Sequence, residues 1–161
     1  MVLGLLVAAA SMGVWIYALF FYDPGLMIDQ LADRTFPRKA EQICATARKQ
    51  IATLPTADQT KDPVDRADTV DRANDYLRDM TGALSPLVPE GQGRITTGIH
   101  EWIADWNTYI ADRQEYADAL RKDPSTRFSE TRKGNRQISL AINAFAQVNR
   151  MESCAVPGDV G

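Results

Sequence analysis

Histidine and cysteine are scarce in this sequence: its 161 residues include one His and two Cys. Structural zinc sites of the usual kind are built from four such ligands, so these three residues cannot assemble one. Basic residues are not in excess either. The sequence has 18 Lys and Arg and 21 Asp and Glu, which gives a formal net charge of -3. Binding to nucleic acid is therefore not expected, since a protein needs surplus positive charge to neutralise phosphates.

The motifs of common catalytic and nucleotide-binding sites are missing as well. The sequence contains no G-x-S-x-G, no Walker-type loop and no H-E-x-x-H. Gly91 and Gly93 superficially resemble a phosphate-binding turn, but no strand is expected before them and no lysine follows at the required offset. At 161 residues the chain is also too short for a two-domain cofactor enzyme. We therefore expect no cofactor and no enzymatic activity.

The single histidine, His100, stands beside Glu101 in a stretch that is expected to be helical. A carboxylate next to an imidazole could make it a general base, provided that a substrate pocket lies at the same place. A lone histidine on a helix is more often a surface or boundary residue. A hydrolase that uses His100 is therefore kept as a third hypothesis, behind two non-catalytic ones.

The first 22 residues, MVLGLLVAAASMGVWIYALFFY, contain no charged side chain. As a helix, residues 2–22 would be about 31 Å long, which matches the hydrocarbon thickness of a bilayer. Aromatic residues gather toward the end of this run, as in the aromatic belt of membrane proteins: Trp15, Tyr17, Phe20, Phe21 and Tyr22. We predict a transmembrane anchor over residues 1–22. A juxtamembrane linker should follow over residues 23–36, with a short helical turn from Leu26 to Asp33.

A cleaved signal peptide and a buried core helix are the alternatives for this segment. A signal peptide begins with basic residues and ends in small ones, whereas here no Lys or Arg precedes the apolar run and bulky aromatics close it. A core helix would have a polar face, which this segment lacks. The abrupt apolar start suggests that a short basic leader belongs before it. The nearest basic residues, Arg34, Arg38 and Lys39, follow the segment, and this charge pattern alone favours a cytoplasmic domain.

The two cysteines, Cys44 and Cys154, are 110 residues apart and form neither a C-x-x-C redox motif nor a metal-binding pattern. A bond between them would stabilise the fold by about 4 to 5 kcal/mol in the chain-entropy model. Two independent thiols are the alternative. We favour the disulfide, because Cys154 lies in an irregular tail with no other anchor. Structural disulfides persist in oxidising compartments, so the bond would place the domain on the extracytoplasmic side, against the charge pattern.

In the soluble part, apolar residues recur every three or four positions, which is typical of amphipathic helices. Four such stretches are separated by Pro- and Gly-marked breaks: Pro37–Leu54, Asp62–Leu84, Arg94–Lys122 and Gln137–Met151. Thr35 is expected near the first N-cap, and Asp62 should cap the second helix with Pro63 behind it. We predict an all-α fold in which residues 37–161 form an antiparallel bundle closed by the disulfide. Between the last two helices, residues 127–136 form either a short hairpin or a surface loop.

Two rows of side chains are candidates for function. Trp102, Trp106 and Tyr109 share one face of the third helix and could line a ligand cleft or a partner surface, although core packing is the default at this spacing. Aspartates at positions 65, 68, 71, 75 and 79 lie along the second helix and are interleaved with arginines. Such oxygen ligands suit a divalent cation, but a solvated face of Asp–Arg pairs is the simpler interpretation. We predict no metal site.

Four stretches of the soluble part resemble a known group of proteins. They are A-E-Q-I-C at Cys44, E-W-I-A-D-W-N-T-Y-I-A-D-R-Q-E-Y-A from Glu101, G-N-R-Q-I-S around Arg136, and the closing F-A-Q-V-N-R-M-E-S-C-A-V-P-G-D-V. Together they are similar to uncharacterised membrane-anchored proteins of actinobacteria, over nearly the whole soluble part. The resemblance implies a single-pass envelope protein with two paired cysteines, and it implies no activity and no catalytic residue.

From these features we expect a non-enzymatic, membrane-anchored domain on the extracytoplasmic side of the cell membrane. It would act through contacts with a membrane or envelope protein, for instance as an accessory subunit of a larger membrane complex. The alternative is an extracytoplasmic ligand-binding sensor or carrier in which Trp102, Trp106 and Tyr109 face a cleft between helices.

Overall fold

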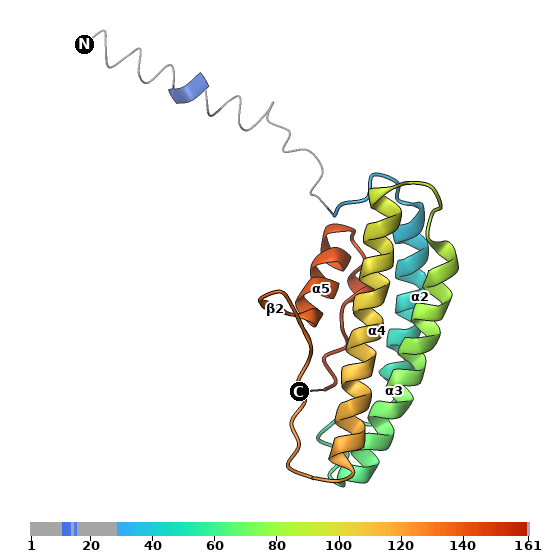
Figure 1. Cartoon of the computed structure of the whole chain (residues 1–161), viewed down its shortest axis with the longest axis vertical. Coiled ribbons are helices and arrows are strands. Elements are labelled where there is room, and N and C mark those ends of the chain that lie inside the picture. Colours follow the sequence, from blue (N-terminus) through green and yellow to red (C-terminus); the bar gives the residue numbers. More distant parts are fainter. Residues whose placement is uncertain (1–10, 14, 16–28, 161) are drawn as a thin grey trace, which may run out of the picture.

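The computed structural model describes residues 11–13, 15 and 29–160 (Figure 1). The elements from residue 29 onward are α2 (Thr35–Ile51), α3 (Pro63–Leu84), η1 (Ser85–Leu87), α4 (Arg94–Leu120), β1 (Arg132–Lys133), β2 (Arg136–Gln137), α5 (Ile138–Val148) and η2 (Glu152–Cys154). The fold is mostly helical, and the predicted helical bundle with a Cys44–Cys154 disulfide is confirmed.

The helices α2, α3 and α4 lie side by side and alternate in direction, and the short α5 lies against α4 (Figure 1). Helix α3 packs between α2 and α4. The C-terminal segment, residues 149–160, completes the bundle, because η2 within it contacts both α2 and α5. The bundle therefore consists of three long antiparallel helices, with α5 and the C-terminal segment together covering the remaining side.

The predicted helix boundaries agree best with the structure where the sequence contains a capping residue. Asp62 caps α3 as expected, with its Oδ1 accepting from the N–H of Val64 at 2.8 Å and of Asp65 at 3.3 Å. At α2 Thr35 lies next to the N-cap residue, Arg34, as expected; it is the first helical residue, and its N–H donates to Asp33 Oδ1 at 2.8 Å. Helix α2 also ends at Ile51 rather than at residue 54, because the residue before Pro55 is disfavoured in helical geometry.

The segment before α2 is docked on the end of α5. The Leu31 N–H donates to Asn149 Oδ1 at 2.8 Å, and Asn149 Nδ2 donates to the Asp29 carbonyl at 2.9 Å. The helical turn expected over residues 26–33 is wrong for its described part, 29–33, because these backbone groups bond to Asn149 instead. Leu31 and Phe36 are buried, so the bundle includes residues that the sequence analysis assigned to the linker.

The predicted anchor, residues 1–22, lies outside the described residues except for positions 11–13 and 15. In the part of the chain that the structure describes, no helix has the length and apolar character needed to cross a membrane.

The segment between α4 and α5 takes the hairpin alternative. Strands β1 and β2 pair antiparallel across a turn in which Gly134 has φ 62°, a left-handed conformation that glycine adopts without strain. The hairpin is tied to α4 by Lys133, whose Nζ lies 2.7 Å from Asp105, and by Thr131, whose N–H donates to Asp112 at 2.7 Å. The all-α prediction therefore holds apart from these two very short strands.

Candidate functional site

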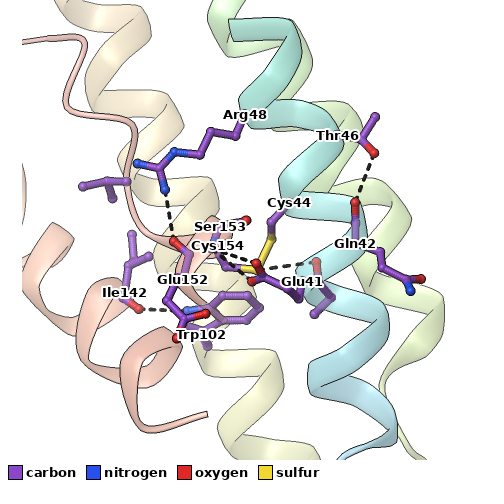
Figure 2. The surroundings of a disulfide bond; sticks show 12 residues. Glu41, Gln42, Cys44, Thr46, Arg48, Trp102, Ile142, Glu152, Ser153 and Cys154 are labelled. Carbon is purple, nitrogen blue, oxygen red and sulfur yellow. Dashed lines mark hydrogen bonds between the residues drawn. A yellow bond between two sulfur atoms is a disulfide. The ribbon is translucent and has the colours of Figure 1, made fainter. Parts of the chain in front are cut away.

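The disulfide joins the middle of α2 to η2. Cys44 and Cys154 are both fully buried, with their Cα atoms 5.0 Å apart. Figure 2 shows the bond lying between α2 and the C-terminal segment. The pairing predicted from the two cysteines is confirmed, and the alternative of two independent thiols is excluded in this structure.

Two side chains of α2 hold the same segment on either side of the disulfide (Figure 2). Glu41, one turn before Cys44, accepts from the Ser153 N–H at 3.0 Å, and Arg48, one turn after, donates from Nη1 to the Glu152 carbonyl at 3.0 Å. Because helical residues spaced three or four apart share a face, one face of α2 makes a covalent, an acceptor and a donor contact with η2. The disulfide is therefore flanked on both sides by hydrogen bonds between α2 and η2.

A second attachment lies at the far end of the C-terminal segment, where Asp159 meets Arg113 of α4. The guanidinium makes two hydrogen bonds to the carboxylate, at 2.5 and 2.8 Å, and its Nε donates to Asn74 Oδ1 at 2.6 Å. Arg66 of α3 donates to the Asp159 carbonyl. The Arg113 side chain has no exposed surface, while that of Asp159 is 24% exposed.

Electrostatics favour the charged form of both partners in this pair. Burial by itself raises the pKa of the Asp159 carboxyl, but the hydrogen bonds and charge of Arg113 outweigh burial, so the pKa lies below its usual value. Burial lowers the pKa of Arg113, but the hydrogen bonds and charge of Asp159, together with Tyr109, raise it by more. The nearby Tyr109 ring lies 5.7 Å from the guanidinium carbon, and burial raises the pKa of the Tyr109 hydroxyl. The pair is therefore an ionised contact inside the bundle.

The buried pair of Arg113 and Asp159 was not predicted from the sequence, although a signal was present. Arg113 occupies a position of the apolar stripe of α4, four residues after Tyr109 and four before Ala117. Asn74 likewise lies beside Ala73 on the buried face of α3. A charged or amide side chain inside an apolar stripe indicates a buried polar partner, and the partner here is distant in the sequence.

The aromatic row of α4 lies in the core. Trp102, Trp106 and Tyr109 are 2%, 1% and 2% exposed. Trp102 stacks on Phe145 at 5.2 Å between ring centroids and donates from Nε1 to the Ile142 carbonyl at 3.2 Å. As placed, the row offers no surface to a ligand or partner, because all three side chains are buried and Trp102 packs against α5. The row therefore packs in the core, which is the default for side chains at this helical spacing.

Two buried polar atoms lack a hydrogen-bond partner within the part of the chain that is described, Trp106 Nε1 and Asn74 Nδ2. Trp106 lines a small pocket of about 10 Å³ beside Cys44 and Pro157. A cavity of that size has room for about one water molecule. Such a water would satisfy the indole N–H.

Three aspartates of the acidic row of α3 are paired with arginines. Arg121 of α4 lies 2.6 Å from Asp68 and 2.5 Å from Asp71, and Arg78 lies 2.7 Å from Asp75. No group of three or more His, Cys, Asp or Glu residues that could hold a metal ion is found in the described ranges. The single histidine, His100, is exposed on α4.

Comparison of this chain with models of protein families, with curated proteins and with solved structures found no match. The resemblance to membrane-anchored actinobacterial proteins therefore stays a prediction. Function must be argued from the attachments of the C-terminal segment and from the surface of the bundle.

Proposed function

We propose that this protein is a non-enzymatic, membrane-tethered helical domain on the extracytoplasmic side, which acts by contact with a membrane or envelope protein. The observation that carries the proposal is the buried Cys44–Cys154 bond. A fold whose C-terminal segment is held by a structural disulfide belongs in an oxidising compartment, since thiols stay reduced in the cytosol.

The tether is supported by the sequence of the first 22 residues, which carry no charge. Within that run, the described side chains of Met12 and Trp15 are 65% and 66% exposed. Exposed apolar side chains of this size suit contact with lipid, and Trp is enriched where a bilayer meets water. A single-pass anchor would hold the bundle at the membrane surface, close to membrane proteins.

Contact with a partner is supported by the division of charge over the bundle. Helix α2 carries four basic residues, Arg38, Lys39, Arg48 and Lys49, and one acidic residue, Glu41. In the part of the chain that the structure describes, every ion pair involves α3, α4 or the segments after them, and none involves α2. Arg38 and Lys39, at the start of α2, are exposed and make no ion pair among the described residues. Basic side chains of this kind steer association with an acidic surface and select against basic ones.

Purification of the full-length chain from its native membranes in mild detergent tests this function. We expect a stoichiometric protein partner that dissociates as the salt concentration rises, because exposed charges are screened within about 10 Å at 0.1 M salt. The Arg38→Glu/Lys39→Glu variant should lose the partner, whereas Arg72→Glu on the exposed face of α3 should keep it. A chain that purifies as a solitary monomer would contradict the proposal.

A further inference from the structure

A cavity of about 310 Å³ lies where the end of α2, the first turns of α3 and the C-terminal segment meet. Its walls come from Ile51 and the following turn, from Arg66 and Thr69 of α3, and from residues 157–159. This volume is at the lower end of the range for small-molecule sites, about 300 to 1,000 Å³. The cavity is distinct from the aromatic row and from the basic residues at the start of α2.

The charged residues of this cavity favour an anion. Two arginines line it, Arg48 and Arg66, and Asp159 is the one acidic residue among the lining residues. The Asp159 carboxylate is already neutralised by its two hydrogen bonds to Arg113. The local balance is therefore positive, with three guanidinium groups around one carboxylate.

The two arginines are held in place and keep donor capacity. Each makes one hydrogen bond to a carbonyl of the C-terminal segment, Arg48 to Glu152 and Arg66 to Asp159. A guanidinium has five N–H donors, so other donors of each can bind a ligand. Arg66 is only 8% exposed, and a charge-assisted hydrogen bond from a partly desolvated guanidinium is stronger than one made in open solvent.

Apart from Thr56 and Thr69, the rest of the wall is apolar. Ile51, Leu54, Pro55 and Pro157 line the cavity beside the arginines. A ligand must therefore combine a planar anionic group, which suits guanidinium donors, with a compact apolar body. Inorganic phosphate fits less well, because it would leave the apolar wall uncovered and bring a second negative charge close to Asp159.

We propose that this cavity binds a small monocarboxylate of about ten non-hydrogen atoms, a size set by its volume of roughly ten water molecules. The carboxylate lies against Arg48 and Arg66, and the apolar body lies against Ile51 and Leu54. The site uses only residues of this chain, so it is independent of the partner proposed above.

Calorimetric titration of the full-length chain in detergent with benzoate, benzamide and inorganic phosphate tests the site. Benzoate and benzamide have the same shape and differ in charge, so benzamide also controls for partition into detergent. We expect benzoate to bind at least about tenfold more tightly than benzamide or phosphate. This is the change in Kd that one charge-assisted hydrogen bond produces. No benzoate binding, equal binding of benzamide, or equal binding of phosphate would each overturn the proposal.

Variants then locate the binding. Arg48→Gln should weaken benzoate binding by about tenfold, whereas Arg38→Gln, also exposed on α2, should leave it unchanged. Since Arg48→Gln also removes a contact to Glu152, a second variant avoids that change: Ala57→Glu places a carboxylate at the exposed rim and should abolish binding. Its control is Ala83→Glu at the exposed end of α3. If Ala57→Glu binds benzoate as Ala83→Glu does, the ligand lies elsewhere and the assignment is wrong.

Discussion

The C-terminal segment is attached to the helices at two places by different chemistry. Near its start a covalent bond joins Cys154 to Cys44 of α2, and near its end an ion pair joins Asp159 to Arg113 of α4. The covalent attachment depends on redox conditions and is indifferent to mild acid. The ionic attachment depends on pH and is indifferent to reductants. The segment thus closes the bundle through two contacts that separate experiments can release.

Loss of the disulfide should have the largest effect. Cys44→Ser removes the bond and should lower the free energy of unfolding by about 4 to 5 kcal/mol, because the closed loop is long. Denaturant unfolding measures the change, with Ala45→Ser on the same helix as the control. Alkylation should also label Cys154 in the Cys44→Ser variant. A change as small as that of the control would show that the bond does not stabilise the fold.

Trp106 lies between the two attachments, beside Cys44 and against Tyr109, with 6.0 Å between ring centroids. Trp106→Ala should cost about 3 to 5 kcal/mol, since it removes a buried aromatic ring and leaves a cavity. Trp106→Phe keeps a ring and removes the unpartnered N–H, so it should cost clearly less. Thermal and denaturant unfolding compare the two. A loss below about 1 kcal/mol for the alanine variant would mean that the ring is not packed as the structure has it.

Breaking the ionic attachment should cost less than breaking the covalent one. Asp159→Asn leaves Arg113 without its charged partner, and we expect a loss of about 2 to 3 kcal/mol, below the usual range for buried pairs because Asp159 is partly exposed. Denaturant unfolding at neutral pH measures it, with Asp118→Asn, an exposed aspartate of α4, as control. Equal stabilities of Asp159→Asn and Asp118→Asn would show that the ion pair does not stabilise the fold.

Acid should have the smallest effect and should separate the attachments most cleanly. The folded protein lowers the pKa of Asp159. The stability from this carboxylate is therefore fully present above its unfolded pKa, about 3.9, and is lost as pH falls through the lower folded pKa. The wild type should lose more stability below about pH 4 than Asp159→Asn does, whereas Cys44→Ser should follow the wild type. Parallel pH profiles for wild type and Asp159→Asn would contradict this.

The sequence predicts the covalent attachment and the helices well, because their signals are local or chemically unique. Asp62 and Pro63 mark the start of α3, and two cysteines in a chain allow a single intramolecular pairing. Arg113 shows its unusual burial only as a break in an apolar stripe, and nothing near Asp159 identifies it as the partner. Long-range polar contacts are set by how helices pack, which a one-dimensional pattern does not contain.

The same reasoning explains the errors at the ends of helices. Asn149 accepts from Leu31 and donates to Asp29, across more than a hundred residues, and this contact prevents the helical turn expected over residues 26–33. Helix α5 ends at Val148, before the predicted end at Met151. Just after this helix end, Arg150 takes the left-handed conformation with φ 54°. The cavity lined by Arg48 and Arg66 was missed because it forms only when three separate segments meet.

The central claim is that the bundle is closed by the Cys44–Cys154 bond in an oxidising compartment. Denaturing alkylation of the chain as intact cells are lysed, followed by mass analysis before and after reduction, tests it most directly. We expect both cysteines to resist a denaturing alkylation until a reductant is added, and then both to be labelled. Labelling of Cys44 and Cys154 without reductant would contradict the bond and, with it, the extracytoplasmic location.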